Sequence, residues 1–230
     1  MANRLTEYRE DQAAGRLRVP ITTYRWAVHT GIAPKPGPGG TWSGEQVEAM
    51  DREAIRAAVP AGGCLSGGQA ADRIAEAIGR PNEAHTRASV AVFVVQQLVG
   101  RGLLTDLSGN PDGSLLHPDQ VAEVCGRADL ARLVAEESPL GPEQAATRLG
   151  IRRVDFDHVT RLGWLTPATY WEVRFGTSRA GAVYVPVYRT VEVDGLCAAH
   201  PEVNWEVVRS SGRGKRSPLA ALKPAGEAVA

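Results

Sequence analysis

The sequence predicts a mainly α-helical chain with small β wings, built from three tandem repeats of one unit. The string Gln-Ala-Ala-x-Arg-Leu/Ile occurs at residues 12–17, 69–74 and 144–149. Around the first and third strings, apolar residues and glycines recur at the same distances. The intervals between the strings differ, which is not the pattern of a solenoid. We therefore expect three small domains joined by loops of different length.

Two short helices account for the region of each string. The first helix carries the string and ends near Arg18 in the first repeat and near Gly150 in the third, where glycine suits a left-handed C-cap. After a tight turn, a second helix runs to the next glycine, Gly31 or Gly163. Apolar residues of the second helices are spaced to face inward, and these are Tyr24, Ala27, Phe156 and Val159.

The residues that flank each helix pair complete the unit. Four positions before each string lies an apolar residue that suits a hydrophobic staple, at Tyr8, Leu65 and Leu140. After each second helix come a Pro/Gly-rich or hairpin-like segment and then an apolar residue five positions before a valine. These pairs are Trp42 and Val47, Leu116 and Val121, and Tyr188 and Val193. Helix, tight turn, helix, wing and closing helix is the plan of the winged helix-turn-helix, so we expect three such units in tandem.

The predicted wings differ between the repeats. Residues 33–42 hold too many prolines and glycines for regular strands and predict a stiff loop, whose only charge is Lys35. Residues 171–175 and 182–188 predict a hairpin whose turn bears Arg179, and Pro186 implies an edge strand. An arginine at a hairpin tip suits a narrow minor groove, or it is a solvated turn charge.

The second repeat departs from the other two. Its expected second helix, within residues 88–104, is apolar on nearly every face, whereas a DNA-reading helix presents polar groups to base edges. We expect this helix to be buried in a domain that spaces the outer two. The alternative is that Val92 and Phe93 form a protein-interaction surface, through which the chain makes a homodimer.

Residues 143–151, 161–165 and 188–193 of the third repeat resemble the MerR and excisionase-like DNA-binding domains. The resemblance is good for the first repeat and loose for the second. In that family the second helix enters the major groove and the wing touches the backbone or the minor groove. Matched by position, the resemblance implies DNA contacts from Thr22, Thr23, Arg25, Trp26, His29, Arg152, Arg153, Asp157, His158 and Arg161, with Lys35, Arg174 and Arg179 added by the wings. Asp155 and Asp157 put negative charge where the family offers polar or basic residues.

Charge and length divide the chain in the same way as the repeats. The predicted boundaries are 1–56, 57–137 and 138–208 for the three units, with a basic flexible tail at 209–230. Net charge is zero, but residues 1–50 carry six basic against five acidic side chains, residues 51–137 eight against twelve, and residues 138–230 twelve against nine. The two ends therefore suit phosphates, and the middle repels them.

Other protein classes lack support in the sequence. No apolar run is long enough to cross a bilayer, and residues 1–7 lack the apolar core of a signal peptide, so we expect a cytoplasmic protein and no membrane partner. Three distant cysteines argue against a disulfide framework. Cys197 and His200 form half of a zinc-like spacing without a second half, so we expect no metal and no other cofactor. Common catalytic motifs are missing, so we expect no enzyme.

The leading hypothesis is a sequence-specific duplex DNA-binding protein of bacterial or phage origin, acting as a transcriptional regulator or an architectural factor. Its partners are then duplex DNA and the transcription machinery. The excisionase resemblance adds a second role, an accessory or directionality factor for a site-specific recombinase. The rival from another class is a protein-interaction adaptor that keeps the winged-helix fold and does not bind DNA. Arginines gathered on one face would favour DNA, and scattered arginines would favour the adaptor.

Overall fold

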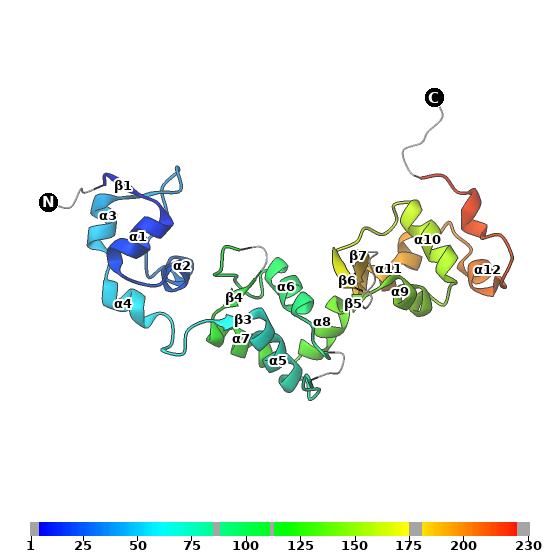
Figure 1. Cartoon of the computed structure of the whole chain (residues 1–230), viewed down its shortest axis with the longest axis horizontal. Coiled ribbons are helices and arrows are strands. Elements are labelled where there is room, and N and C mark those ends of the chain that lie inside the picture. The colour runs from blue at the N-terminus through cyan, green and yellow to red at the C-terminus, as the bar shows by residue number, and fades with distance from the viewer. Residues whose placement is uncertain (1–4, 85–87, 111–112, 175–180, 225–230) are drawn as a thin grey trace, which may run out of the picture. The chain divides into compact units, whose positions relative to one another are not determined.

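The chain folds into helices and small antiparallel sheets (Figure 1). A computed structural model describes residues 5–84, 88–110, 113–174 and 181–224. The coarse prediction, a mainly α-helical chain with small β elements, is therefore confirmed. The chain divides into two compact units, residues 1–130 and 131–230. The finer division into three winged helix-turn-helix domains stays a prediction.

One order of elements occurs three times along the chain: strand, helix, helix, strand, helix, helix. The first repeat consists of β1 (Glu7–Tyr8), α1 (Glu10–Leu17), α2 (Ile21–Thr30), β2 (Trp42–Ser43), α3 (Gly44–Ala49) and α4 (Arg52–Ala57). The second consists of β3 (Leu65–Ser66), α5 (Gly67–Ala77), α6 (Val92–Gly100), β4 (Leu115–Leu116), α7 (Pro118–Cys125) and α8 (Leu130–Glu137). The third consists of β5 (Pro139–Leu140), α9 (Pro142–Leu149), α10 (Arg153–Arg161), β7 (Ala182–Arg189), α11 (Thr190–Ala199) and α12 (Trp205–Ser210), with β6 (Thr169–Arg174) before β7 and the 3-10 helix η1 (Pro218–Ala221) at the end.

The same strand pair closes each repeat. The staple residue before each string lies opposite the apolar residue that precedes the valine: Tyr8 opposite Trp42, Leu65 opposite Leu116, and Leu140 opposite Tyr188. Each staple residue also lies directly before the N-cap of the first helix, as expected. The spacing in the sequence therefore reflects one antiparallel bridge that recurs in all three repeats.

Local signals explain where the first helices end. Arg18 and Gly150 both take left-handed backbone conformations, with φ of 54° and 69°, and close α1 and α9 as predicted. At the start of α5, the Ser66 hydroxyl accepts from the Gln69 amide at 3.2 Å, and the Gln69 side chain accepts from the Ser66 amide at 2.9 Å. This reciprocal capping box satisfies donors that the first turn of a helix leaves open.

Equivalent aromatic pairs fill the cores of the two outer repeats. Tyr24 of α2 meets Trp42 edge-on with ring centroids 5.3 Å apart, and Phe156 of α10 meets Tyr188 in the same way at 5.2 Å. All four rings are buried, and the predicted inward residues Ala27 and Val159 are buried beside them. Edge-to-face packing adds to the burial of these large side chains and fixes the second helix against the closing strand.

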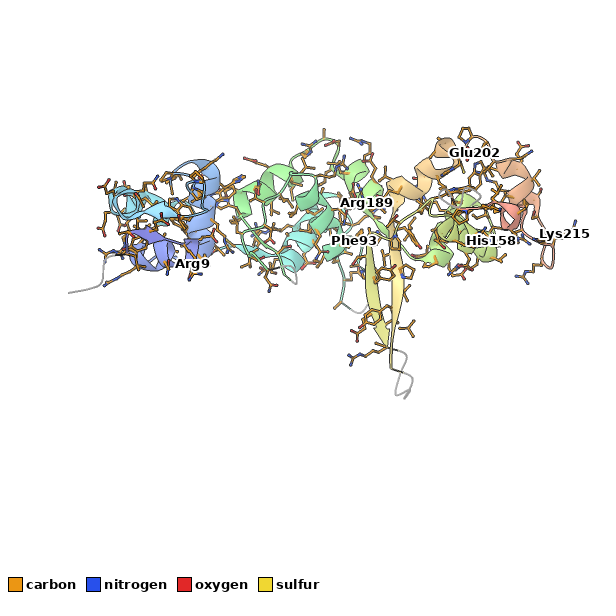
Figure 2. The ribbon with its side chains drawn as sticks, turned by 90° about the horizontal axis from the view of Figure 1, so that it is seen from above. Arg9, Phe93, His158, Arg189, Glu202 and Lys215 are labelled. Carbon is orange, nitrogen blue, oxygen red and sulfur yellow. The ribbon has the colours of Figure 1, made fainter. Side chains whose placement is uncertain are left out.

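The apolar helix of the second repeat is buried, as the spacer interpretation requires. Phe93, Val94, Val95 and Leu98 of α6 are buried, and Figure 2 shows Phe93 among the surrounding helices. The assignment of Phe93 to a partner surface is therefore wrong, because its side chain fills the core of its own repeat. Val92 is 42% exposed, so of Val92 and Phe93 only Val92 is accessible to a partner.

The third repeat carries the long hairpin that the sequence predicts. β6 and β7 pair antiparallel from Thr169 opposite Val187 to Arg174 opposite Ala182. In the order β5-β7-β6 the strand β7 is central only at Tyr188 and Arg189, where β5 pairs with it. Among the described strands none pairs with Pro186 on that side, so Pro186 lies on an edge of β7, where its missing amide hydrogen leaves no ladder bond unmade.

Residues 209–224 do not form a flexible tail. Leu219 is buried in the core of the third repeat together with Trp205 and Val208. Ser217 is also buried, and its hydroxyl caps η1 by accepting from the Leu219 amide. The expectation of a flexible tail is therefore wrong for this segment. Its basic, glycine-rich composition is typical of a flexible chain, but burial of the single residue Leu219 anchors the segment to the third repeat. Within the described residues, every helix is too short or too polar to cross a lipid bilayer.

Candidate nucleic-acid interface

The candidate reading helix of the first repeat, α2, packs against the second repeat within the compact unit 1–130. Thr23 is buried. Thr22 hydrogen-bonds Cys64, which precedes β3. Burial raises the pKa of the Cys64 thiol, although the hydrogen bond with Thr22 acts to lower it. Because it is buried, Thr23 is not placed to reach bases in a groove.

Arg25 binds the loop that follows α6. Its Nε and Nη2 donate to Glu10 at 2.9 and 2.7 Å, and its Nη1 donates to the carbonyl of Leu107 at 2.9 Å. The guanidinium packs directly against Gly109. A Cβ at that position would lie only 2.6 Å from Nη1, so a larger residue would displace the arginine. Gly109 also has a φ of 63°, which glycine tolerates best. Arg25 is thus a structural link between two repeats.

A stack of rings completes this contact. Trp26 lies on His117 at 4.1 Å between ring centroids and 12° between planes, and on His29 at 5.2 Å. The His117 Nδ1 accepts from the Asp119 amide, so Nε2 carries the hydrogen and donates to the Ala58 carbonyl at 3.0 Å. His29 Nε2 lies 3.3 Å from the Thr105 hydroxyl.

These contacts correct the expectation that α2 presents Thr23, Arg25 and Trp26 to DNA, because Thr23 is buried and Arg25 and Trp26 contact the second repeat. Thr22 is half-exposed and His29 is exposed, so DNA contact by these two stays a prediction. The physical reason is that a polar, half-exposed helix face suits a protein surface as well as a DNA groove, and here the second repeat contacts Arg25 and Trp26 of that face. Lys35 lies apart from this face, exposed in the loop between α2 and β2. Of the two cations of the first repeat that the sequence assigned to DNA, Lys35 is exposed on the predicted wing, and Arg25 is held by Glu10 and the Leu107 carbonyl.

The third repeat uses Arg152 in its own structure. Arg152 pairs with the fully buried Asp155 at 2.7 Å, and its Nη1 donates to the carbonyls of Gly212 and Lys215 at 2.7 and 2.9 Å. Burial acts to raise the pKa of Asp155, but hydrogen bonds from Arg152 and Ser217 outweigh it and hold that pKa below its usual value. Arg152 and Asp155 therefore anchor the C-terminal segment, which corrects the expectation from the resemblance that Arg152 faces a DNA groove.

The other basic side chains of α10 already have protein partners. Arg153 pairs with Asp157 one turn on, and with Glu143 of α9 at 3.5 Å. The Arg161 Nε donates to His158 Nδ1 at 3.2 Å, and its Nη2 donates to the Leu222 carbonyl at 3.0 Å. Arg153, His158 and Arg161 lie at or near the surface, so contact with DNA requires exchange of these bonds.

The C-terminal segment adds a basic loop beside α10. Arg152 holds the loop by the carbonyls of residues 212 and 215, and Arg161 holds the following turn at residues 219 and 222. The exposed cations of the loop are Arg213, Lys215 and Arg216. Figure 2 labels Lys215 on this segment and His158 on α10. No acidic residue occurs between 207 and 224, so positive charge gathers beside this helix.

The hairpin contributes one described candidate. Arg174, at the end of β6, is 79% exposed and pairs with Glu172 at 2.7 Å. Arg179 lies outside the described residues. The arginines that the resemblance assigned to DNA in the third repeat, apart from Arg179, lie at α10 and on the hairpin. Arg152, Arg153, Arg161 and Arg174 each have an acidic or carbonyl partner, so these four do not form a single row of uncompensated charge.

Comparison with protein-family models, with curated proteins and with solved structures finds no match to this chain. Among the described residues, no three His, Cys, Asp or Glu side chains are grouped to hold a metal ion.

Sequence reasoning missed the basic loop as an ordered feature. The available signal was the pair Ser217 and Leu219, a cap residue and an apolar residue within a polar stretch. It also missed the role of Arg152, whose signal is Asp155 three positions later, the spacing of neighbours on a helix. Both signals are short, and the composition around them conceals them.

Proposed function

We propose that this protein binds duplex DNA through the third repeat, with the basic loop at residues 212–216 making the main phosphate contacts. The observation that carries the proposal is the anchoring of three exposed cations beside α10 by Arg152. A fixed loop loses less conformational entropy on binding than a free tail, so its charges act on a defined stretch of backbone. The role of the protein is then transcriptional control or DNA architecture.

Base readout in this proposal belongs to α10. His158 and Arg153 are partly exposed on the helix next to the loop. Their partners, Arg161 and Asp157, are surface groups, and surface ion pairs contribute little to stability. Exchange of such bonds for contacts with base edges therefore costs little. Phosphate contacts from the loop position the helix, and the helix supplies specificity.

The test is the salt dependence of binding to duplex DNA. The double variant Arg213→Ala/Arg216→Ala should reduce the magnitude of the slope of log affinity against log salt by about 2, because two phosphate contacts are lost. The matched control is Arg73→Ala/Arg80→Ala, which removes two exposed arginines from the other compact unit. The control should leave the slope unchanged. Equal slopes for both variants would remove the loop from the interface.

A second candidate function is a protein-interaction adaptor. It is favoured by the way α2 is used, because Arg25 and Trp26 bind the second repeat instead of presenting polar groups outward. The adaptor gains if the unmodified chain binds no duplex DNA at low salt, where electrostatic attraction is strongest. The role as a recombinase accessory factor requires DNA binding first, and it is tested by whether a recombinase binds better to DNA that carries this protein.

A further inference from the structure

The hairpin of β6 and β7 projects from the other elements of its compact unit as a two-stranded ribbon (Figure 2). β5 pairs with the last two residues of β7 and leaves the rest of that edge without a described neighbour. Among the described residues, β6 pairs with β7 alone. A ribbon of two strands is marginally stable in water, and a third strand or a packed face is needed to secure it.

Both faces of this ribbon expose large apolar side chains. The register puts Trp171, Val173, Val183 and Val185 on one face, with Trp171 42% and Val183 48% exposed. Tyr170 and Tyr184 lie on the other face and are 58% and 65% exposed. Such a surface is typical of a protein contact, where aromatic side chains are enriched.

The two edges of the ribbon are not equivalent. β7 contains Pro186, which has no amide hydrogen to donate to an added strand. β6 has the sequence Thr-Tyr-Trp-Glu-Val-Arg, without proline or glycine and rich in residues that favour strands. An exposed edge of this kind is a template for another strand, so β6 is the edge that suits strand addition.

We propose that two molecules of this protein associate through antiparallel pairing of their β6 strands, with Val173 of one chain opposite Val173 of the other. The charge pattern of β6 selects the partner. In this register Glu172 of each chain lies opposite Arg174 of the other, so the strand is complementary to itself. Glu172 and Arg174 already pair within one chain at 2.7 Å, and pairing of two chains arranges four alternating charges on one face.

Different contacts supply affinity and register in this dimer. Backbone hydrogen bonds and contacts of Val173 with the other Val173 and, diagonally, with Trp171 hold the strands together. The exposed charges mainly fix the register, because opposite pairs are favoured and like pairs directly opposite are disfavoured. This association differs from a dimer through the second repeat, since Phe93 there is buried.

The experiment measures self-association of the full chain by sedimentation at increasing concentration. Glu172→Arg and Arg174→Glu each place two like-charge pairs in the dimer, and each should weaken self-association about tenfold. An equimolar mixture of the two variants restores four opposite charges and should associate as the unmodified chain does. The double variant Glu172→Arg/Arg174→Glu should also dimerise. Circular dichroism checks that each variant keeps its fold.

Each other outcome rejects the proposal. A chain that stays monomeric up to about 100 μM, a range that detects micromolar affinity, has no such dimer. A dimer that neither substitution weakens uses another surface, and loss of that dimer in Val92→Asp would place it on the second repeat. Single variants that lose association without recovery on mixing would show that Glu172 and Arg174 do not face each other between chains.

Discussion

At the scale of single residues, the contact between the first two repeats depends on a glycine. Gly109 has a left-handed backbone and leaves room for the Arg25 guanidinium. Gly102 has a similar φ of 72°, but a Cβ there would meet no atom within 4 Å. Alanine substitutions at the two glycines therefore distinguish the cost of a strained backbone, which both share, from the cost of steric contact with Arg25, which only Gly109 has.

We predict that Gly109→Ala destabilises the chain by about 1–3 kcal/mol more than Gly102→Ala, because the added methyl group displaces Arg25. Urea unfolding measures both. In the background Arg25→Ala the difference between the two alanine variants should vanish, since the clash is then removed. A difference that persists without Arg25 would mean that the guanidinium does not occupy this site.

A second residue prediction concerns acid. The pKa of Asp155 is depressed in the folded state, so the ionised carboxylate adds stability that is complete above the ordinary aspartate value of 3.8. This contribution is lost as the pH falls below 3.8 toward the depressed pKa. The variant Asp155→Asn, which cannot ionise, should lose less stability than the unmodified chain over this range. Urea midpoints measured from about pH 5 down to about pH 3 compare the two slopes, and parallel slopes would contradict the prediction.

At the scale of elements, much of the fold could be predicted from the sequence. The glutamine strings, their staple residues and the later valines determine three helix pairs and their closing strands, because these signals act over short distances or through simple burial. The partners of polar helix faces could not be predicted. Arg25 and Trp26 on α2 have the same pattern whether the partner is DNA or another repeat, and only the long-range contact with residues 105–117 distinguishes them.

The predicted spacer role of α6 has its own test. Phe93→Ala should cost about 3–5 kcal/mol of stability, because it opens a cavity in a buried site. Val92→Ala on the same helix should cost less than about 1 kcal/mol, since Val92 is largely exposed. Thermal or urea unfolding compares them. Equal losses would contradict the burial of Phe93, and neither change should alter affinity for DNA.

At the scale of the whole molecule, the C-terminal segment belongs to a folded unit and also carries its charge. Leu219 is buried while Leu222, three residues later, is 39% exposed. Deletion of residues 209–230 therefore confounds two effects, because it removes cations and a core residue together. Single substitutions distinguish them.

We predict that Leu219→Ala lowers stability by about 2–5 kcal/mol and increases hydrogen exchange in α9 and α10, whereas Leu222→Ala does neither. Exchange followed by mass spectrometry locates the effect along the chain. Peptides of residues 5–84 should be unchanged, because Leu219 lies in the other compact unit. Protection of α10 that survives Leu219→Ala would mean that η1 does not support this helix.

The recurrence of one closing bridge has a consequence for how the chain reaches its native state. A nascent chain with three interchangeable bridges risks exchange of strands between repeats, a known failure of repeat proteins. Here the bridges differ in size: tyrosine with tryptophan, leucine with leucine, and leucine with tyrosine. A strand from the wrong repeat would leave a void or overfill the core, and either costs stability. The difference in size between the bridges thus favours pairing of each strand with the partner from its own repeat as the chain folds.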